Sequence, residues 1–258
     1  MKTYILSLQS EWQKIRHSAA AWLVIIGGLF VPFILTIVQS VYPNKLSPNA
    51  LKQDYWSVLF QHSWESMAIL LLPAGIILAT SLICQIEFRN NAWKQVFATP
   101  QRFSTLFVAK LTMVVMMLFQ FFIINFIGFL LCAYLPSLWS GGGVPSFPPM
   151  SVLSRFNFHF FIASLPLLAF QFLLAMRFKN FLVSIGGGIG IIVTSIFAFS
   201  WKYGYLLPFS HITMVFTQMT GHSHIPEGTS IILHSILWFI GISGLHFIIY
   251  IAQKERAS

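Results

Sequence analysis

The chain has very little charge for its length. Lys and Arg account for 15 of its 258 residues and Asp and Glu for only 6, so 8% is charged, against roughly 25% in a soluble domain. Hydrophobic residues make up 57%, and 27 residues are phenylalanine. A soluble fold could not cover such a core with polar surface. The composition excludes a soluble enzyme, a disordered tail and a nucleic-acid-binding module, and it predicts a membrane protein.

Motifs for metal and nucleotide chemistry are also missing. The two cysteines, Cys84 and Cys132, form no Cys-x-x-Cys pair, so a cysteine-based zinc site is not expected. The glycine runs at 141–143 and 184–190 are not followed by Gly-Lys-Ser/Thr, which excludes a phosphate-binding loop. We therefore expect no catalytic residue and no cofactor bound by this chain.

Long uncharged runs predict the fold. About 20 apolar residues cross the hydrocarbon core, and a span must satisfy its own backbone hydrogen bonds, which favours helices. We predict an all-α integral membrane protein with a single domain over residues 1–258. Its six spans are expected at 19–38, 67–86, 111–135, 156–176, 181–200 and 228–251. No acidic residue falls inside them, which argues against a proton- or sodium-driven carrier. The segment 203–226 is interpreted as a partly buried outer loop or a re-entrant piece.

Basic residues predict the orientation. With both termini inside, only Lys45, Lys52, Arg155 and Lys202 fall on the outer side, and the other Lys and Arg residues fall on the cytoplasmic side. This asymmetry follows the positive-inside rule. It explains the net charge of +9 without a nucleic-acid partner. We expect a multi-pass protein of the bacterial plasma membrane with both termini in the cytoplasm.

Residues 1–18 predict an amphipathic helix rather than a cleaved signal. Polar and charged residues interrupt any apolar core after Lys2, whereas Tyr4, Leu8, Trp12 and Ile15 recur at helical spacing. An apolar stripe beside a basic face suits a helix that lies in the cytoplasmic headgroup layer among membrane lipids.

Two patterns outside the cytoplasmic loops predict further sites. In the fifth span, Gly186 and Gly190 form a small-xxx-small pair that allows a neighbouring helix to approach closely. In the outer loop 39–66, aromatic residues suit the outer headgroup layer and predict a rim near the exit. The rim residues are Tyr55, Trp56, Phe60 and Trp64.

The histidines carry the main alternative interpretation. His222 and His224 form a His-x-His pair, with His211 upstream and Glu227 downstream, a set that could bind zinc or copper. Nothing else in the sequence fixes a metal geometry there, so we expect no metal site. The alternatives that stay open are a histidine-based membrane enzyme, a metal-handling protein, and a sensor or structural subunit without transport.

The longest cytoplasmic connection joins spans two and three, and we refer to 87–104 as the coupling loop. Ala92, Val96 and Phe97 form a short apolar face at helical spacing, and Thr99-Pro100 ends the helix. An amphipathic helix of this kind can insert into a groove of a soluble partner.

The loop and its surroundings resemble the ABC-2 type permeases, which are the membrane subunits of type V ABC exporters. The resemblance rests on Glu87, Trp93-Lys94, Thr99-Pro100-x-Arg102 and Lys110. It extends to the amphipathic N-terminus and the six spans. The stretch after the fifth span resembles that of the small permeases of lantibiotic and bacitracin immunity, with Trp201-Lys202-Tyr203 followed by Leu207-Pro208. Larger relatives have a glycine at the position of Asn91, and this difference favours the small immunity-type permeases.

The resemblance implies an exporter permease that expels a hydrophobic or amphipathic substrate: an antimicrobial peptide, an antibiotic or a lipid-like compound. It implies a separate ABC ATPase that carries ATP and Mg, and a second permease copy, either identical or a close paralogue. Within the coupling loop, Trp93, Val96 and Phe97 are expected to insert into the ATPase. Arg102 is expected to pair with an acid of the ATPase, and Glu87 and Lys94 to cap the short helix.

Overall fold

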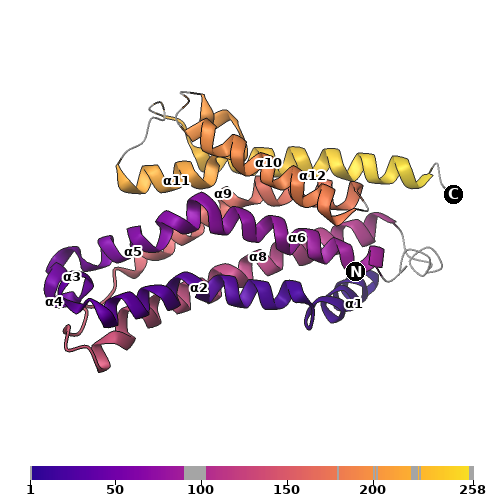
Figure 1. Ribbon diagram of the computed structural model, residues 1–258. Coiled ribbons are helices and arrows are strands. Elements are labelled where there is room, and N and C mark those ends of the chain that lie inside the picture. The colour runs from indigo at the N-terminus through magenta and orange to yellow at the C-terminus, as the bar shows by residue number, and fades with distance from the viewer. Residues whose placement is uncertain are drawn as a thin grey trace.

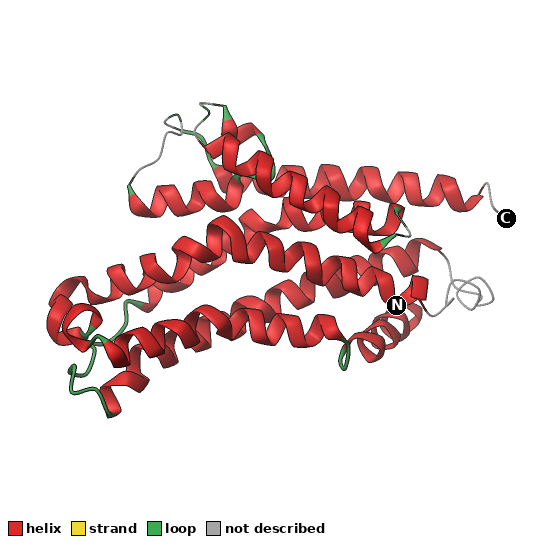
Figure 2. Ribbon diagram, in the orientation of Figure 1, coloured by secondary structure: helices red, strands yellow, loops and turns green. Residues whose placement is uncertain are grey.

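Every regular element in the computed structural model is a helix. The structure describes residues 2–89, 103–178, 180–199, 201, 203–221, 226 and 228–255, and none of these forms a strand (Figure 2). Six helical stretches in this part of the chain are long and apolar enough to cross a membrane. They are Ala19–Val41, Tyr55–Ile86, Phe103–Leu138, Met150–Arg177, Phe181–Ala198 and Ile231–Ala252. The predicted all-helical fold with six spans is confirmed.

The long helices run side by side along the bundle (Figure 1). In chain order the elements are α1 (Lys2–Ile15), α2 (Ala19–Val41), α3 (Pro43–Leu46), α4 (Pro48–Leu51), η1 (Lys52–Asp54), α5 (Tyr55–Ser66), η2 (Met67–Leu71), α6 (Leu72–Arg89), α8 (Phe103–Tyr134), η3 (Leu135–Leu138), α9 (Met150–Arg177), α10 (Phe181–Phe199), η4 (Gly204–Leu206), α11 (His211–Thr220) and α12 (Ile231–Glu255). Helix α1 and the C-terminal end of α12 lie at one end of the bundle, which we call the α1 end. Helices α3 and α4 lie at the opposite end, the α4 end (Figure 1).

The second span begins earlier than the sequence predicts. The prediction placed 39–66 in an outer loop, but α5, η2 and α6 form one continuous helical stretch, Tyr55–Ile86. Its 32 residues are about 48 Å long at 1.5 Å per residue, more than the roughly 30 Å of hydrocarbon core. The π turn η2 ends at Leu71, two residues before Pro73, which has no N–H to bond the carbonyl of Ile69. The wider turn absorbs this interruption so that the helix continues.

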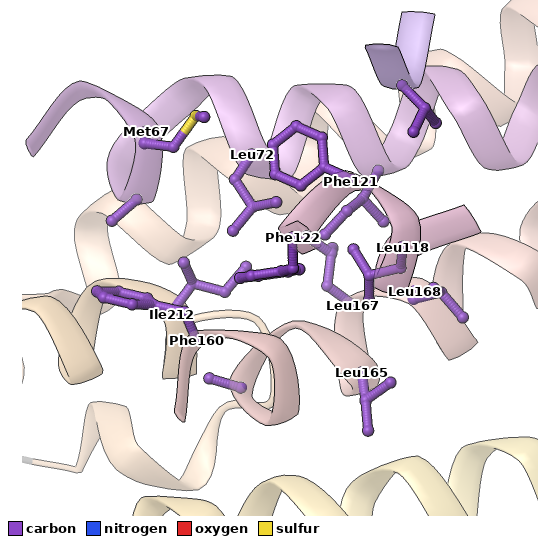
Figure 3. Close-up of a cluster of buried hydrophobic side chains, with 14 of the residues drawn as sticks. Met67, Leu72, Leu118, Phe121, Phe122, Phe160, Leu165, Leu167, Leu168 and Ile212 are labelled. Carbon is purple, nitrogen blue, oxygen red and sulfur yellow. The ribbon is translucent and has the colours of Figure 1, made fainter. Parts of the chain in front are cut away.

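The core lies between the spans and is made of apolar side chains. Helix α2 packs mainly on α8, α9 on α12, and α6 on α9. Figure 3 shows part of this core, with Leu72 from α6, Phe122 from α8 and Leu167 from α9 among the labelled side chains. Ile212 of α11 joins the same cluster. The long helices are thus held by tight apolar packing, the main association force between helices in lipid.

The structure describes most of the segment 203–226, and much of the described part is helical. Helix α11 packs on α9, and Ile212 and Val215 are buried. The helix ends at Gly221, whose φ of 75° is the left-handed conformation typical of a helix C-terminus. The described part of this segment therefore contains a helix that is partly buried against α9.

Candidate functional site

The α1 end of the bundle brings together the elements that flank the coupling loop. Helix α6 ends at Arg89 and α8 begins at Phe103, both at this end (Figure 1). Glu87 lies in the last turn of α6. The other predicted ATPase-contacting residues lie outside the described residues; they are Trp93, Lys94, Val96, Phe97 and Arg102. The candidate site is therefore the helical frame of the coupling loop, made of α1, the end of α6 and the start of α8.

A buried ion pair fixes α1 on α8. The Nζ atom of Lys110 lies 3.3 Å from Oε2 of Glu11, and Lys14 donates a second hydrogen bond to Oε1 of Glu11. Glu11 and Lys110 are each only 5% exposed. Nearer the N-terminus, the hydroxyl of Tyr4 donates to Oγ1 of Thr112 at 3.0 Å. These contacts hold α1 against the first turns of α8, directly after the coupling loop.

The electrostatic environment keeps Glu11 ionised. Burial raises the pKa of the Glu11 carboxyl, but the ammonium groups of Lys110 and Lys14 outweigh burial and leave the pKa below its usual value of 4.5. A buried ion pair adds little net stability, yet removal of one partner is costly. The pair therefore acts mainly to define where α1 sits on α8.

The remaining surface of α1 is open and carries large apolar side chains beside polar ones. Ile5, Leu6 and Trp12 are exposed, whereas Ser7, Glu11 and Ile15 face the rest of the protein. A soluble amphipathic helix would show the reverse arrangement. Exposed apolar side chains on a membrane protein suit the headgroup and acyl boundary.

A second polar cluster joins three membrane-spanning helices, and we call it the Gln171 cluster (Ser81, Gln171 and Ser184). Nε2 of Gln171 in α9 donates to Oγ of Ser81 in α6 at 2.9 Å and to the carbonyl oxygen of Ser184 in α10 at 3.1 Å. All three residues are buried. Hydrogen bonds between spans help to hold helices together in lipid. Because α6 leads into the coupling loop, the cluster connects that helix to α9 and α10.

Neither the Glu11–Lys110 pair nor the Gln171 cluster is predicted from the sequence. A lone glutamine within an apolar run is a recognisable signal, since polar residues in spans commonly bond across helices. The partners of Gln171 cannot be read from spacing, because they lie 90 and 13 residues away along the chain. The same holds for Glu11 and Lys110, which are 99 residues apart.

The glycine that packs closely within the chain is Gly188. A Cβ atom there would lie 2.6 Å from Cγ2 of Ile77 in α6 and 2.8 Å from Oε1 of Gln171. By contrast, a Cβ atom on Gly186 or Gly190 would meet no heavy atom within 4 Å. The packing predicted for Gly186 and Gly190 is therefore absent within the described chain, and the close contact of α10 occurs at Gly188 instead.

The predicted outer aromatic rim lies inside the protein. The four rim residues, Tyr55, Trp56, Phe60 and Trp64, are all buried. Trp64 stacks on Phe160 with ring centroids 3.8 Å apart, and the hydroxyl of Tyr55 donates to Oε1 of Gln39 at 2.9 Å. Their burial follows from the helical stretch that begins at Tyr55, which turns these large rings into the core while the polar atoms of Tyr55 and Trp56 keep hydrogen-bond partners. They do not form an exposed headgroup-facing rim in this chain.

His211 is part of a packing contact between α11 and α12. Its Nε2 lies 3.0 Å from the carbonyl oxygen of Tyr205, and its Nδ1 lies 2.8 Å from Oγ of Ser235 in α12. Burial lowers the pKa of His211 to about 4, so the ring is neutral at neutral pH. Since a carbonyl can only accept, the hydrogen-bond network assigns the proton to Nε2. Both ring nitrogens are thus engaged in joining α11 to its neighbours.

The metal hypothesis gains no support from the residues that the structure describes. Among them, no three His, Cys, Asp or Glu side chains gather as a metal site would require. His222, His224 and Glu227 lie outside the described residues.

Comparison with known proteins identifies the family. The family model described as ABC-2 family transporter protein matches residues 7–200, from α1 to the end of α10. The chain belongs to the ABC-2 family of transporter proteins. Neither a curated protein nor a solved structure matches it.

Membership in the ABC-2 family establishes the general role of the chain. The chain is a multi-pass membrane permease and is not itself an enzyme, because the ABC-2 permease domain lacks the ATPase. Permeases of this family work with an ABC ATPase subunit. The match includes α1, the helices that flank the coupling loop and the Gln171 cluster.

Proposed function

We propose that this ABC-2 permease is the membrane subunit of an exporter that expels a hydrophobic or amphipathic compound. The observation that carries the proposal is the family match over α1 to α10, together with six apolar spans. In this proposal a separate ATPase binds ATP and Mg and supplies the energy. Both termini lie in the cytoplasm of a bacterium, so the α1 end faces the ATPase, as the positive-inside asymmetry supports.

The coupling loop is the proposed contact with the ATPase. Support comes from its place in the sequence between α6 and α8, the helix to which Glu11 and Lys110 fasten α1. Trp93, Val96 and Phe97 insert into the ATPase in this proposal, Arg102 pairs with an acid at the edge, and Glu87 and Lys94 cap the loop helix. Movement of the loop would reach α9 and α10 through α6 and the Gln171 cluster.

The substrate class and the assembly are narrower parts of the proposal. The resemblance to small lantibiotic and bacitracin immunity permeases supports an antimicrobial peptide, an antibiotic or a lipid-like compound as the substrate. A second permease copy, identical or paralogous, completes the pathway, because an ATPase that closes as a dimer needs a coupling loop on each side. Gly186 and Gly190 leave open space for a neighbouring helix, as such an assembly would need.

Substitutions in the coupling loop test the proposal. A buried aromatic anchor contributes about 2 kcal/mol or more to binding, whereas an ion pair at the rim contributes about 0–1 kcal/mol. Trp93→Ala and Phe97→Ala should therefore weaken ATPase co-purification by about thirtyfold or more. Arg102→Ala should weaken it by about fivefold or less. The ATPase encoded with the permease serves as the partner, and a peptide-antibiotic panel measures resistance.

Two controls make the loop experiment decisive. Surface labelling must find each variant in the membrane at wild-type amounts, and Gln101→Ala tests a polar position in the same loop. If both aromatic variants retain ATPase binding and resistance, the loop is a topological spacer and the coupling assignment is wrong. If the ATPase binds but no compound in the panel becomes more toxic to a deletion strain, the proposed substrate class is wrong.

A further inference from the structure

An apolar groove of about 690 Å³ lies between α2, α6 and α8. We call it the α2–α6 groove. It is separate from the coupling loop and from the Gln171 cluster, and its volume lies within the range of roughly 300–1,000 Å³ that is typical of ligand sites. Its inner wall includes Leu72 of α6, Leu118 of α8 and Leu168 of α9, which Figure 3 shows in the core.

The groove opens sideways, toward the lipid-facing surface. On α2 its wall includes Trp22 and Phe30, whose side chains are 61% and 47% exposed. On α6 the wall includes Gly75, where a Cβ atom would meet no heavy atom within 4 Å. A glycine at this position leaves a gap that a side chain would fill. The gap is therefore reachable from the membrane and is not closed by the chain itself.

The extent of the groove matches one leaflet. Along α2 its wall runs from Ala19 to Phe30, and along α6 from Leu71 to Ile83. At 1.5 Å per residue these stretches are about 16 Å and 18 Å long, close to half of the roughly 30 Å hydrocarbon core. The α2 stretch begins at the α1 end, and the α6 stretch finishes toward the same end at Ile83, six residues before the helix ends at Arg89. A helix of a second copy would cross the whole core, whereas an acyl chain occupies one leaflet, so the dimensions favour a lipid tail.

The charge at the mouth of the groove favours an anionic lipid. Arg16 is exposed in the turn between α1 and α2, three residues before Ala19. Trp22, one turn into α2, lies where aromatic side chains meet the headgroup layer. A basic residue at this level attracts anionic headgroups. The turn and the groove thus present a positive charge above an apolar slot.

We propose that the α2–α6 groove binds one acyl chain of an anionic phospholipid from the leaflet at the α1 end, with Arg16 beside the lipid phosphate. The lipid fills the gap at Gly75 and completes the packing between α2 and α6. Voids in tightly packed structures forfeit contacts, so a resident chain restores them. The proposal concerns a resident lipid and does not depend on transport; in the orientation proposed above, the leaflet is the cytoplasmic one.

Lipid retention by the purified full chain tests the proposal. The protein is exchanged into an equimolar mixture of phosphatidylglycerol and phosphatidylcholine with 16-carbon chains, and bound lipid is measured by native mass spectrometry. Gly75→Phe places a ring in the groove and should abolish retained lipid. Gly241→Phe is the matched control, because Gly241 also has open space beside it but lies on α12, away from the groove. Arg16→Gln should reduce the preference for phosphatidylglycerol by about fivefold.

A second measurement avoids dependence on any variant. Phosphatidylglycerol with a photoreactive acyl chain is bound to the wild-type chain, and labelled peptides are mapped. Labels should concentrate on peptides of α2 and α6 that line the groove, rather than on the exposed face of α12. Labels spread evenly over all exposed spans would overturn the proposal.

Three other results would also overturn the proposal. The first is that Gly75→Phe retains as much lipid as the wild type. The second is that Gly75→Phe separates two copies of the chain while lipid retention is unchanged, which would assign the groove to a protein interface. The third is that Gly75→Phe abolishes resistance while lipid retention is unchanged, which would assign the groove to the exported compound.

Discussion

Glu11 of α1 and Lys110 of α8 form a buried ion pair, with 3.3 Å between Oε2 and Nζ, although 99 residues separate them in sequence. The pair joins α1 to α8, the helix that follows the coupling loop. Lys14 adds a second hydrogen bond to the same carboxylate. In the proposed coupling mechanism, a movement of α8 driven by the ATPase would be transmitted to α1.

The first prediction is that Glu11→Gln destabilises the protein more than removal of both charges. Loss of one partner from a buried pair costs about 3–5 kcal/mol, whereas replacement of both by apolar residues is often neutral. The single variant should lower the thermal unfolding temperature of the detergent-purified chain. The double variant Glu11→Leu with Lys110→Met should recover most of the loss. The control Lys14→Gln removes a less buried partner and should cost about 1 kcal/mol or less. Equal losses in the single and double variants would contradict this prediction.

The second prediction is that stability falls between pH 6.5 and about 4 because of His211. Burial lowers the pKa of His211 from 6.5 to about 4, so folding favours the neutral ring. Its contribution is complete above pH 6.5 and decreases as pH falls toward the folded value, by at most about 3 kcal/mol. His211→Gln should flatten that part of a plot of unfolding temperature against pH. A wild-type slope in His211→Gln would disprove the assignment.

The third prediction concerns two glycines on α10. Gly188→Ala places a methyl group 2.6 Å from Ile77, and such overpacking costs about 1–3 kcal/mol. Gly186→Ala meets open space and should be neutral or stabilise the helix by up to about 1 kcal/mol. Thermal unfolding of the two variants measures the difference. The opposite order of stability would show that α10 packs on another face.

The fourth prediction tests the burial of the aromatic residues of α5. Trp64 is 2% exposed and stacks on Phe160, so Trp64→Ala should cost about 3–5 kcal/mol. Trp139→Ala removes an exposed ring near the same end of the bundle and should change stability by about 1 kcal/mol or less. Protein yield and thermal unfolding in detergent measure both effects. If the two substitutions cost the same, Trp64 faces the membrane surface as the sequence suggested.

The sequence predicts the spans well because hydropathy is a local property. An apolar run must lie in the membrane whatever its neighbours are, and charges at its ends limit its length. The predicted starts of the first and fifth spans, at residues 19 and 181, coincide with those of the structure. The second span departs furthest from its predicted start, since Glu65 and the polar residues near it favoured a loop, while packing of Tyr55 and Trp64 draws that segment into the helix.

The sequence by itself determined that the chain is a bundle of six apolar helices with a surface helix at its start, and motif resemblance indicated its family. Only the tertiary structure decided which side of each helix faces the protein. In a bilayer, lipid-facing and interior positions are both apolar, so periodicity carries little information about orientation. Gly188 rather than Gly186, the buried aromatic residues of α5 and the open groove at Gly75 all follow from that rotation. The Glu11–Lys110 pair follows from the fold that brings two distant segments together at one end of the bundle.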